Sequence, residues 1–120
     1  NQINENAKNF STRMELPNIN HHLLEGLREP KSNQKNLCFI FLNSHLYHKR
    51  NQKRYEITKK VIKKNKINFT EYSLSSKTKL DQVFEALVFG SYASFYLAML
   101  NKINPSPVPF VDFFKKEIGK

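Results

Sequence analysis

Residues 37–42 read LCFIFL, an unbroken run of six apolar residues with polar segments on both sides. A run this short and rich in aromatic and branched side chains favours a β-strand buried on both faces, the pattern of parallel sheets. Residues 67–72, INFTEY, alternate apolar and polar side chains and predict a second strand. Between them, residues 53–65 predict an amphipathic helix whose inner face carries Tyr55, Thr58, Val61 and Ile62. The order strand, helix, strand predicts an α/β fold with a parallel sheet covered by helices.

Helical patterns lie on both sides of this unit. Residues 18–28 predict a helix that Pro30 ends, and residues 108–118 predict a final amphipathic helix. Residues 78–103 are so apolar that they predict a central helix, broken or kinked at Gly90-Ser91. That helix is expected to supply most of the core volume, through Leu80, Val83, Phe84, Leu87, Phe95, Leu97 and Leu100. Only two strands are predicted, and a free-standing doubly wound sheet needs more, so the chain is expected to be incomplete.

Length and composition predict one folded domain over residues 1–120, because 39% of the residues are hydrophobic and ten are Phe. No charge-free apolar run reaches the roughly 18 residues of a membrane span, so no membrane partner is expected. The single cysteine, Cys38, lies in the apolar run and is predicted to be a buried, inert thiol. One cysteine excludes an internal disulfide framework and suits a reducing cytoplasm.

The net charge of +10 is concentrated in one segment. Residues 49–66 hold nine Lys and Arg side chains against Glu56 alone, so this segment carries +8 of the total. Three interpretations remain open: a solvated helix face, attraction of an anionic ligand such as a phosphorylated sugar, and nucleic-acid binding that weakens with salt. No RNA-binding motif or aromatic stacking platform accompanies the charge, so no nucleic-acid partner is expected.

Four short motifs occur in order along the chain. Residues 3–8, INENAK, precede residues 16–21, LPNINH, and residues 91–98, SYASFYLA, precede residues 104–108, NPSPV. They resemble the NENAK, elPElNHNE, dyvSyYLA and DPTPV motifs of the bifunctional phosphoglucose/phosphomannose isomerases. The chain is similar to the C-terminal half of that family. This resemblance implies a SIS-type, flavodoxin-like fold, a parallel sheet flanked by helices, here truncated at its N-terminus.

The resemblance also implies a reaction, the aldose–ketose isomerisation of a phosphorylated hexose. Glucose 6-phosphate or mannose 6-phosphate would be interconverted with fructose 6-phosphate, because a base moves a proton between neighbouring carbons through an enediol. Glu5 matches the glutamate of NENAK, which the resemblance makes the base. Its neighbours Asn4 and Asn6 are expected to orient it and to contact the substrate. Without the resemblance, a Glu in a polar helix is ordinarily a solvated surface residue.

A histidine and a lysine complete the implied site. His21 matches the histidine of NHNE, to which the resemblance assigns ring opening, and Asn20 beside it is expected to contact the substrate. An imidazole suits this role because its reference pKa of about 6.5 lets it exchange protons near neutrality. Lys115 matches the family's lysine beside the substrate oxygens. Surface roles for both residues remain open. On a helix His21 and His22 would point about 100° apart, which disfavours a joint metal site.

Partners are implied by the same resemblance. The family supplies its histidine across a dimer interface, which implies a homodimer. Its Ser/Thr-rich phosphate loop lies in an N-terminal SIS half, and this chain is expected to fold stably only with such a piece. Neither a metal nor an organic cofactor is implied. The chain departs from the family at Asn18 and at His22-Leu23, where carboxylates are lost. An alternative therefore stays open: a non-catalytic SIS module that binds a phosphosugar for regulation or dimerisation.

Overall fold

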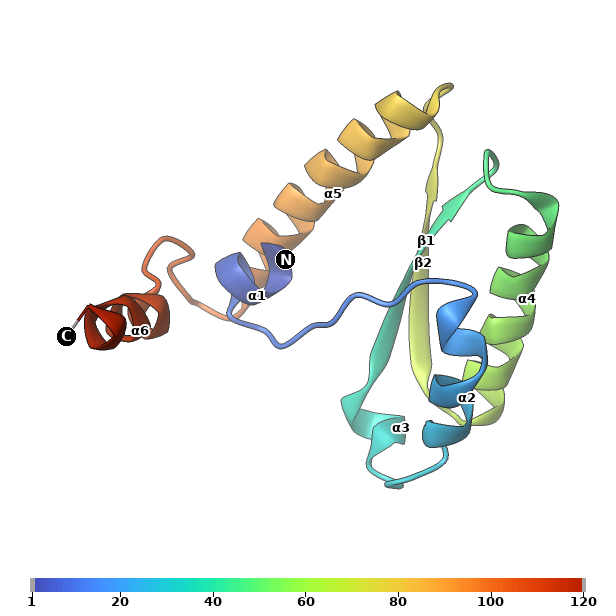
Figure 1. Cartoon of the computed structure of the whole chain (residues 1–120), viewed down its shortest axis with the longest axis horizontal. Helices are drawn as coiled ribbons and strands as arrows, with labels where there is room; N and C mark the ends of the chain where they lie inside the picture. The colour runs from blue at the N-terminus through green and yellow to red at the C-terminus, as the bar shows by residue number, and fades with distance from the viewer. Residues whose placement is uncertain (1, 120) are drawn as a thin grey trace. The chain divides into compact units, whose positions relative to one another are not determined.

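The computed structural model describes residues 2–119, which form an α/β chain with a two-stranded parallel sheet flanked by helices (Figure 1). The chain divides into two compact units. The sheet unit comprises residues 13–86, and the helical unit comprises the described residues up to 12 and from 87 onward. The fold class predicted from the sequence is confirmed.

The sheet unit is built on one strand–helix–strand crossover. Strands β1 (Cys38–Ser44) and β2 (Asn68–Leu74) pair in parallel along their whole length, and helix α4 (Lys49–Lys64) connects them. A parallel pair requires such a crossover, because a tight turn cannot bring the chain back to the same end of the sheet. Both predicted strands and the predicted helix are confirmed, with slightly longer bounds.

The core of the sheet unit lies between α4 and one face of the strand pair. Ile62 and Thr58 of α4 are fully buried, which confirms the predicted inner face of the helix. The Phe41 ring meets the rings of Tyr55 and Phe69 edge to face, with centroids 5.7 and 5.8 Å apart. The buried apolar cluster consists of Leu27, Phe41, Ile62 and Ile67, with Leu23, Leu24, Phe39, Tyr55 and Phe69 packed against it.

The helix predicted over residues 18–28 is split in the structure. A 3-10 turn, η1 (Asn18–Asn20), is followed by the short helix α2 (His22–Gly26), and His21 lies between them. The Asn20 side chain turns inward and donates a hydrogen bond to Thr58 Oγ1 at 2.7 Å. The one-turn helix α3 (Asn33–Asn36) then leads into β1.

The second face of the strand pair is less covered than predicted. Helices α2 and α4 both lie on one side of the strands (Figure 1). Ile40 is 52% exposed, and Cys38 is exposed as well. Alternate residues of a strand point to opposite faces, and only one of these faces meets α2 and α4. The predicted burial of both strand faces, and of the Cys38 thiol, is therefore wrong within this chain.

Helix α5 (Lys79–Leu100) begins in the sheet unit and continues into the helical unit, which also holds α1 (Gln2–Ala7) and α6 (Pro109–Ile118). The predicted break at Gly90 is wrong, because α5 runs through this residue without interruption. At Gly90 a Cβ would meet the flexible end of the Gln2 side chain of α1, which would have to shift.

Most of the apolar side chains of α5 and α6 are exposed. Leu80 is 64% exposed and Leu100 is 80% exposed, so the prediction that α5 supplies most of the core is wrong for the described residues. A helix that is apolar around most of its circumference is normally covered on all sides. By length and composition alone α5 could also cross a membrane, but the core helix of a soluble protein passes the same test.

Candidate active site

Helix α1 is held on α5 by side-chain hydrogen bonds. Gln2 Nε2 donates to Ser91 Oγ at 2.6 Å, and Asn6 Nδ2 donates to Ser94 Oγ at 3.1 Å. Ala7 of α1 and Ala98 of α5 are both fully buried. Because a six-residue helix is not stable by itself in water, the position of α1 depends on these contacts.

The loop after α5 reaches the end of α1. Lys8 Nζ donates to the carbonyl oxygens of Glu5, at 2.5 Å, and of Pro105, at 3.1 Å. Asn101 Nδ2 donates to Asn9 Oδ1 at 2.7 Å. Three segments that are far apart in the sequence, residues 2–9, 91–101 and 104–107, are thereby joined within the helical unit.

A hollow with a volume of about 470 Å³ lies where these three segments meet. Its lining mixes polar and aromatic side chains and consists of Asn6, Ser91, Tyr92, Phe95, Pro105 and Ser106. Tyr92 lines this hollow and is 62% exposed. An apolar helical pattern does not reveal which face stays open, so nothing in the sequence indicates that Tyr92 lines a hollow.

Glu5 is exposed on α1, and it is not part of the lining of the hollow, although its neighbour Asn6 is. The expected hydrogen bonds from its neighbours go elsewhere. The Asn4 amide exchanges hydrogen bonds with the Ser11 backbone, at 2.5 and 2.9 Å, and the Asn6 amide donates to Ser94. In this structure Asn4 and Asn6 therefore fix the α1 backbone. Lys115 lies on α6, is exposed, and is not part of the lining of the hollow.

The other two predicted site residues belong to the sheet unit. His21 is exposed, and its ring meets the His22 ring edge to face with centroids 4.4 Å apart. Asn20 holds η1 against α4 through Thr58, while its Oδ1 atom is buried without a partner among the described residues. Within residues 2–119 no group of three His, Cys, Asp or Glu side chains could hold a metal ion.

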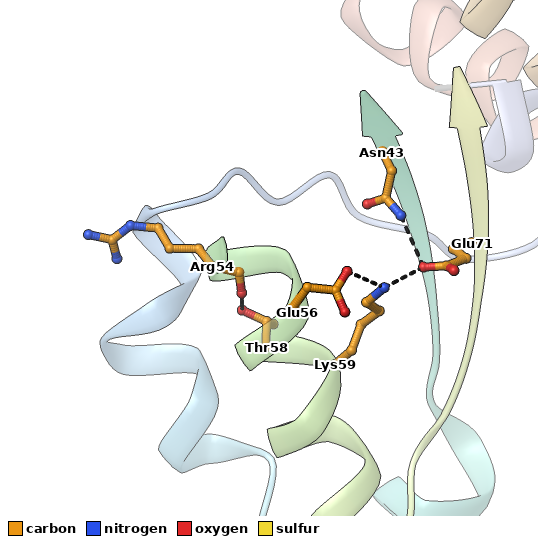
Figure 2. Close-up of polar contacts among 6 residues, drawn as sticks. All are labelled: Asn43, Arg54, Glu56, Thr58, Lys59 and Glu71. Atoms are coloured by element: carbon orange, nitrogen blue, oxygen red, sulfur yellow. Dashed lines mark hydrogen bonds and ion pairs between the residues drawn. The ribbon is translucent and has the colours of Figure 1, made fainter. Parts of the chain in front are cut away.

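One lysine of the basic segment is engaged in a polar cluster that the sequence did not predict. Figure 2 shows Lys59 between two carboxylates, with its Nζ 2.8 Å from Glu56 and 2.6 Å from Glu71 of β2. Asn43 of β1 also donates to Glu71, at 3.0 Å. The pKa of Lys59 is raised overall. Partial burial acts to lower it, but the hydrogen bonds to both carboxylates have the larger combined effect. The pKa of Glu71 is lowered, chiefly by the hydrogen bond from Lys59. Lys59 thus links α4 to β2 through its ion pair with Glu71.

The loop after β2 binds a carboxylate of its own chain. The backbone N–H groups of Ser75 and Ser76 donate to Glu85 at 3.0 and 2.9 Å, and Tyr72 Oη donates at 3.1 Å. These bonds, the Ser75 backbone bond first, lower the pKa of Glu85 to about 2. Backbone N–H groups after a parallel strand are the donors that anionic ligands use. Here they are occupied by Glu85.

The fold and the converging motifs define the class of protein. The chain belongs to the family of the bacterial phospho-glucose isomerase C-terminal SIS domain, which matches residues 1–118. The match includes both the sheet unit and the segments around the hollow.

Individual relatives agree with this assignment. The chain is 29% identical over 119 residues to the bifunctional phosphoglucose/phosphomannose isomerase of Caldicellulosiruptor bescii, and 26% identical over 118 residues to that of Thermoplasma acidophilum. These matches cover 99% and 98% of this chain but 35% and 36% of the relatives, so the chain spans about a third of their length. No solved structure matches the chain. The family inferred from the motifs is confirmed.

Proposed function

We propose that this chain is the C-terminal SIS half of a phosphosugar isomerase that interconverts glucose 6-phosphate and mannose 6-phosphate with fructose 6-phosphate. The observation that carries the proposal is the convergence of α1, the second half of α5 and the 104–107 loop around one hollow. These segments hold three of the four motifs that the chain shares with the isomerase family. Surface packing alone would not require all of them to meet at an open, partly polar hollow.

In the proposed reaction Glu5 is the proton-transferring base. Its carboxylate takes the proton from C2 of the open-chain aldose, and the electrons of that bond form the enediolate with its charge on O1. The same group then returns a proton to C1, while the O2 hydroxyl proton is transferred to O1 and leaves the ketose carbonyl at C2. The exposure of Glu5 on a helix fixed by its neighbours supports this role, because a base must reach the substrate from a held position. His21 opens the sugar ring, and the Lys115 ammonium stabilises the oxygen that becomes negative.

The phosphate group would be bound outside this chain. The donors of the Ser75-Ser76 loop are filled by Glu85, which supports the view that a Ser/Thr-rich loop of an N-terminal SIS half supplies the phosphate site. The proposal includes a cytoplasmic homodimer in which the neighbouring subunit completes the site. It requires no metal and no organic cofactor, because side chains suffice for both proton transfers.

The test is the Glu5→Gln variant of the full-length protein. Loss of a general base should lower kcat by roughly 10²- to 10⁴-fold while substrate affinity is retained. The matched control is Glu25→Gln, since Glu25 is an exposed glutamate of α2 in the sheet unit, and its turnover should be unchanged. A wild-type protein that binds phosphosugars without turnover would instead establish the non-catalytic SIS module.

A further inference from the structure

Ser94 is a fully buried polar residue in the apolar helix α5. Its hydroxyl donates to the Ser91 carbonyl oxygen at 3.1 Å and accepts the hydrogen bond from Asn6 Nδ2 at 3.1 Å. Burying a hydroxyl is unfavourable unless its hydrogen bonds are satisfied. An alanine would pack more simply in this helix, so the serine is best explained by the bond that it makes to α1.

The surface of α5 around Ser94 is shaped for close contact with α1. Gly90, Ser94 and Ala98 are spaced four residues apart and therefore lie on one face of the helix. The Gln2 side chain occupies the space in which a Cβ on Gly90 would lie, and Ala7 is fully buried in the helical unit, as is Ala98 of this face. Close approach alone would let α1 slide or rotate. The Asn6–Ser94 bond ends on the fully buried Ser94, and together with the exposed bonds of Gln2 to α5 it favours one register.

We propose that Ser94 is a positioning residue for the isomerase reaction. It acts through Asn6, and the register that it gives α1 places the Glu5 carboxylate at the substrate. The inference rests on the proposed function, since it needs Glu5 to be the base. Ser94 touches no reacting atom. Its effect is therefore expected in the rate of proton transfer and not in the binding of the phosphorylated sugar, which other residues hold.

The expected result follows from the sensitivity of proton transfer to geometry. In Ser94→Ala the Asn6 amide loses its acceptor. The remaining bonds of Gln2 to α5 are exposed, so we expect α1 to shift slightly along α5. A misplacement of about 1 Å can cost on the order of 100-fold in rate. We therefore expect kcat of the full-length protein to fall roughly 10- to 100-fold, with KM changed less than about twofold and the pH profile of kcat retained.

The experiment compares Ser94→Ala, Asn6→Ala and the double variant with the wild type. Ser32→Ala is the control for the same chemical change at an exposed serine whose hydroxyl makes no capping bond. If Ser94 acts through Asn6, the double variant should be no slower than the worse single variant. Hydrogen exchange of the α1 amides should accelerate in all three variants and stay unchanged in Ser32→Ala.

Two outcomes would overturn the inference. One is a folded Ser94→Ala protein with wild-type kcat. The other is a double variant whose loss of kcat equals the product of the losses in the two single variants. Failure of the proposed function would look different, because Glu5→Gln would then keep its turnover whatever Ser94 does. If Ser94→Ala does not fold, Asn6→Ala removes the same hydrogen bond and provides the same test. Asn6 is only half-buried, so its replacement should disturb folding less.

Discussion

At the scale of single residues, hydrogen bonds to particular partners fix the positions of polar side chains in this protein. Glu85 is the clearest case, because two backbone N–H groups and the Tyr72 hydroxyl converge on its carboxylate. Sequence alone shows a glutamate in an apolar helix and does not show that it closes the loop after β2. The contact ties the start of α5 to the end of the sheet.

The pKa of Glu85 makes this contact testable by pH. Its folded value of about 2 lies below the unfolded value of about 4.3, so the carboxylate contributes stability that is complete above the unfolded pKa. That stability is lost as the pH falls through about 2. A carboxyl carbon titration by NMR should show Glu85 with a midpoint near 2, and Glu85→Gln should flatten the loss of stability in acid. A Glu85 midpoint above 4 would contradict the contact.

Residue roles could be predicted from the sequence only in part. The motif around Glu5 was visible, but the partners of Asn4 and Asn6 were not, because Ser11 and Ser94 are brought to them by the fold. Cys38 was predicted to be buried from its apolar neighbours. It is exposed because burial depends on which face of the strand is covered, and a continuous apolar run does not specify that.

At the scale of elements, the strand–helix–strand unit is stabilised by one face of α4. Ile62 is fully buried against the sheet, whereas Ile57 on the same helix is 49% exposed. Periodicity predicted this difference correctly, because positions spaced by one helical turn share a face. The split between η1 and α2 is not visible in the periodicity, and neither is the Asn20 hydrogen bond that links η1 to Thr58, 38 positions away.

A matched pair of isoleucines tests the packing of α4. Ile62→Ala should lower the free energy of unfolding of the sheet unit by about 2–5 kcal/mol, because it removes transfer energy and leaves a cavity. Ile57→Ala should cost less than about 1 kcal/mol. Native-state hydrogen exchange of the β1 and β2 amides in the full-length protein measures both values. Equal losses for the two variants would show that the inner face of α4 is assigned wrongly.

At the scale of the whole molecule, the described residues leave much apolar surface open. Phe110 and Phe113 of α6 are 88% and 65% exposed, and α5 is open along much of its length. The sequence predicted a central helix, and the apolar pattern that led to this prediction is present. The pattern does not show which surface covers this helix, and under the proposed function we expect an N-terminal SIS half to cover it.

The isolated 120-residue chain is accordingly expected to be only marginally folded. Its urea transition should be broad with a small m-value, because little apolar surface is buried, and the chain should bind the dye ANS. Adding the N-terminal half, or using the full-length protein, should give a steep transition and remove the dye binding. A cooperative transition with a large m-value for the isolated chain would contradict this expectation.

The central claim is that Glu5 carries a proton between two carbons of a phosphorylated hexose. It is tested most directly by incubating fructose 6-phosphate with the full-length protein in D₂O and following deuterium at C1 and C2 by NMR. The wild type should form aldose phosphate and introduce deuterium, and Glu5→Gln should do both at least about 100-fold more slowly. Hydrogen transfer at the wild-type rate in Glu5→Gln would contradict the claim.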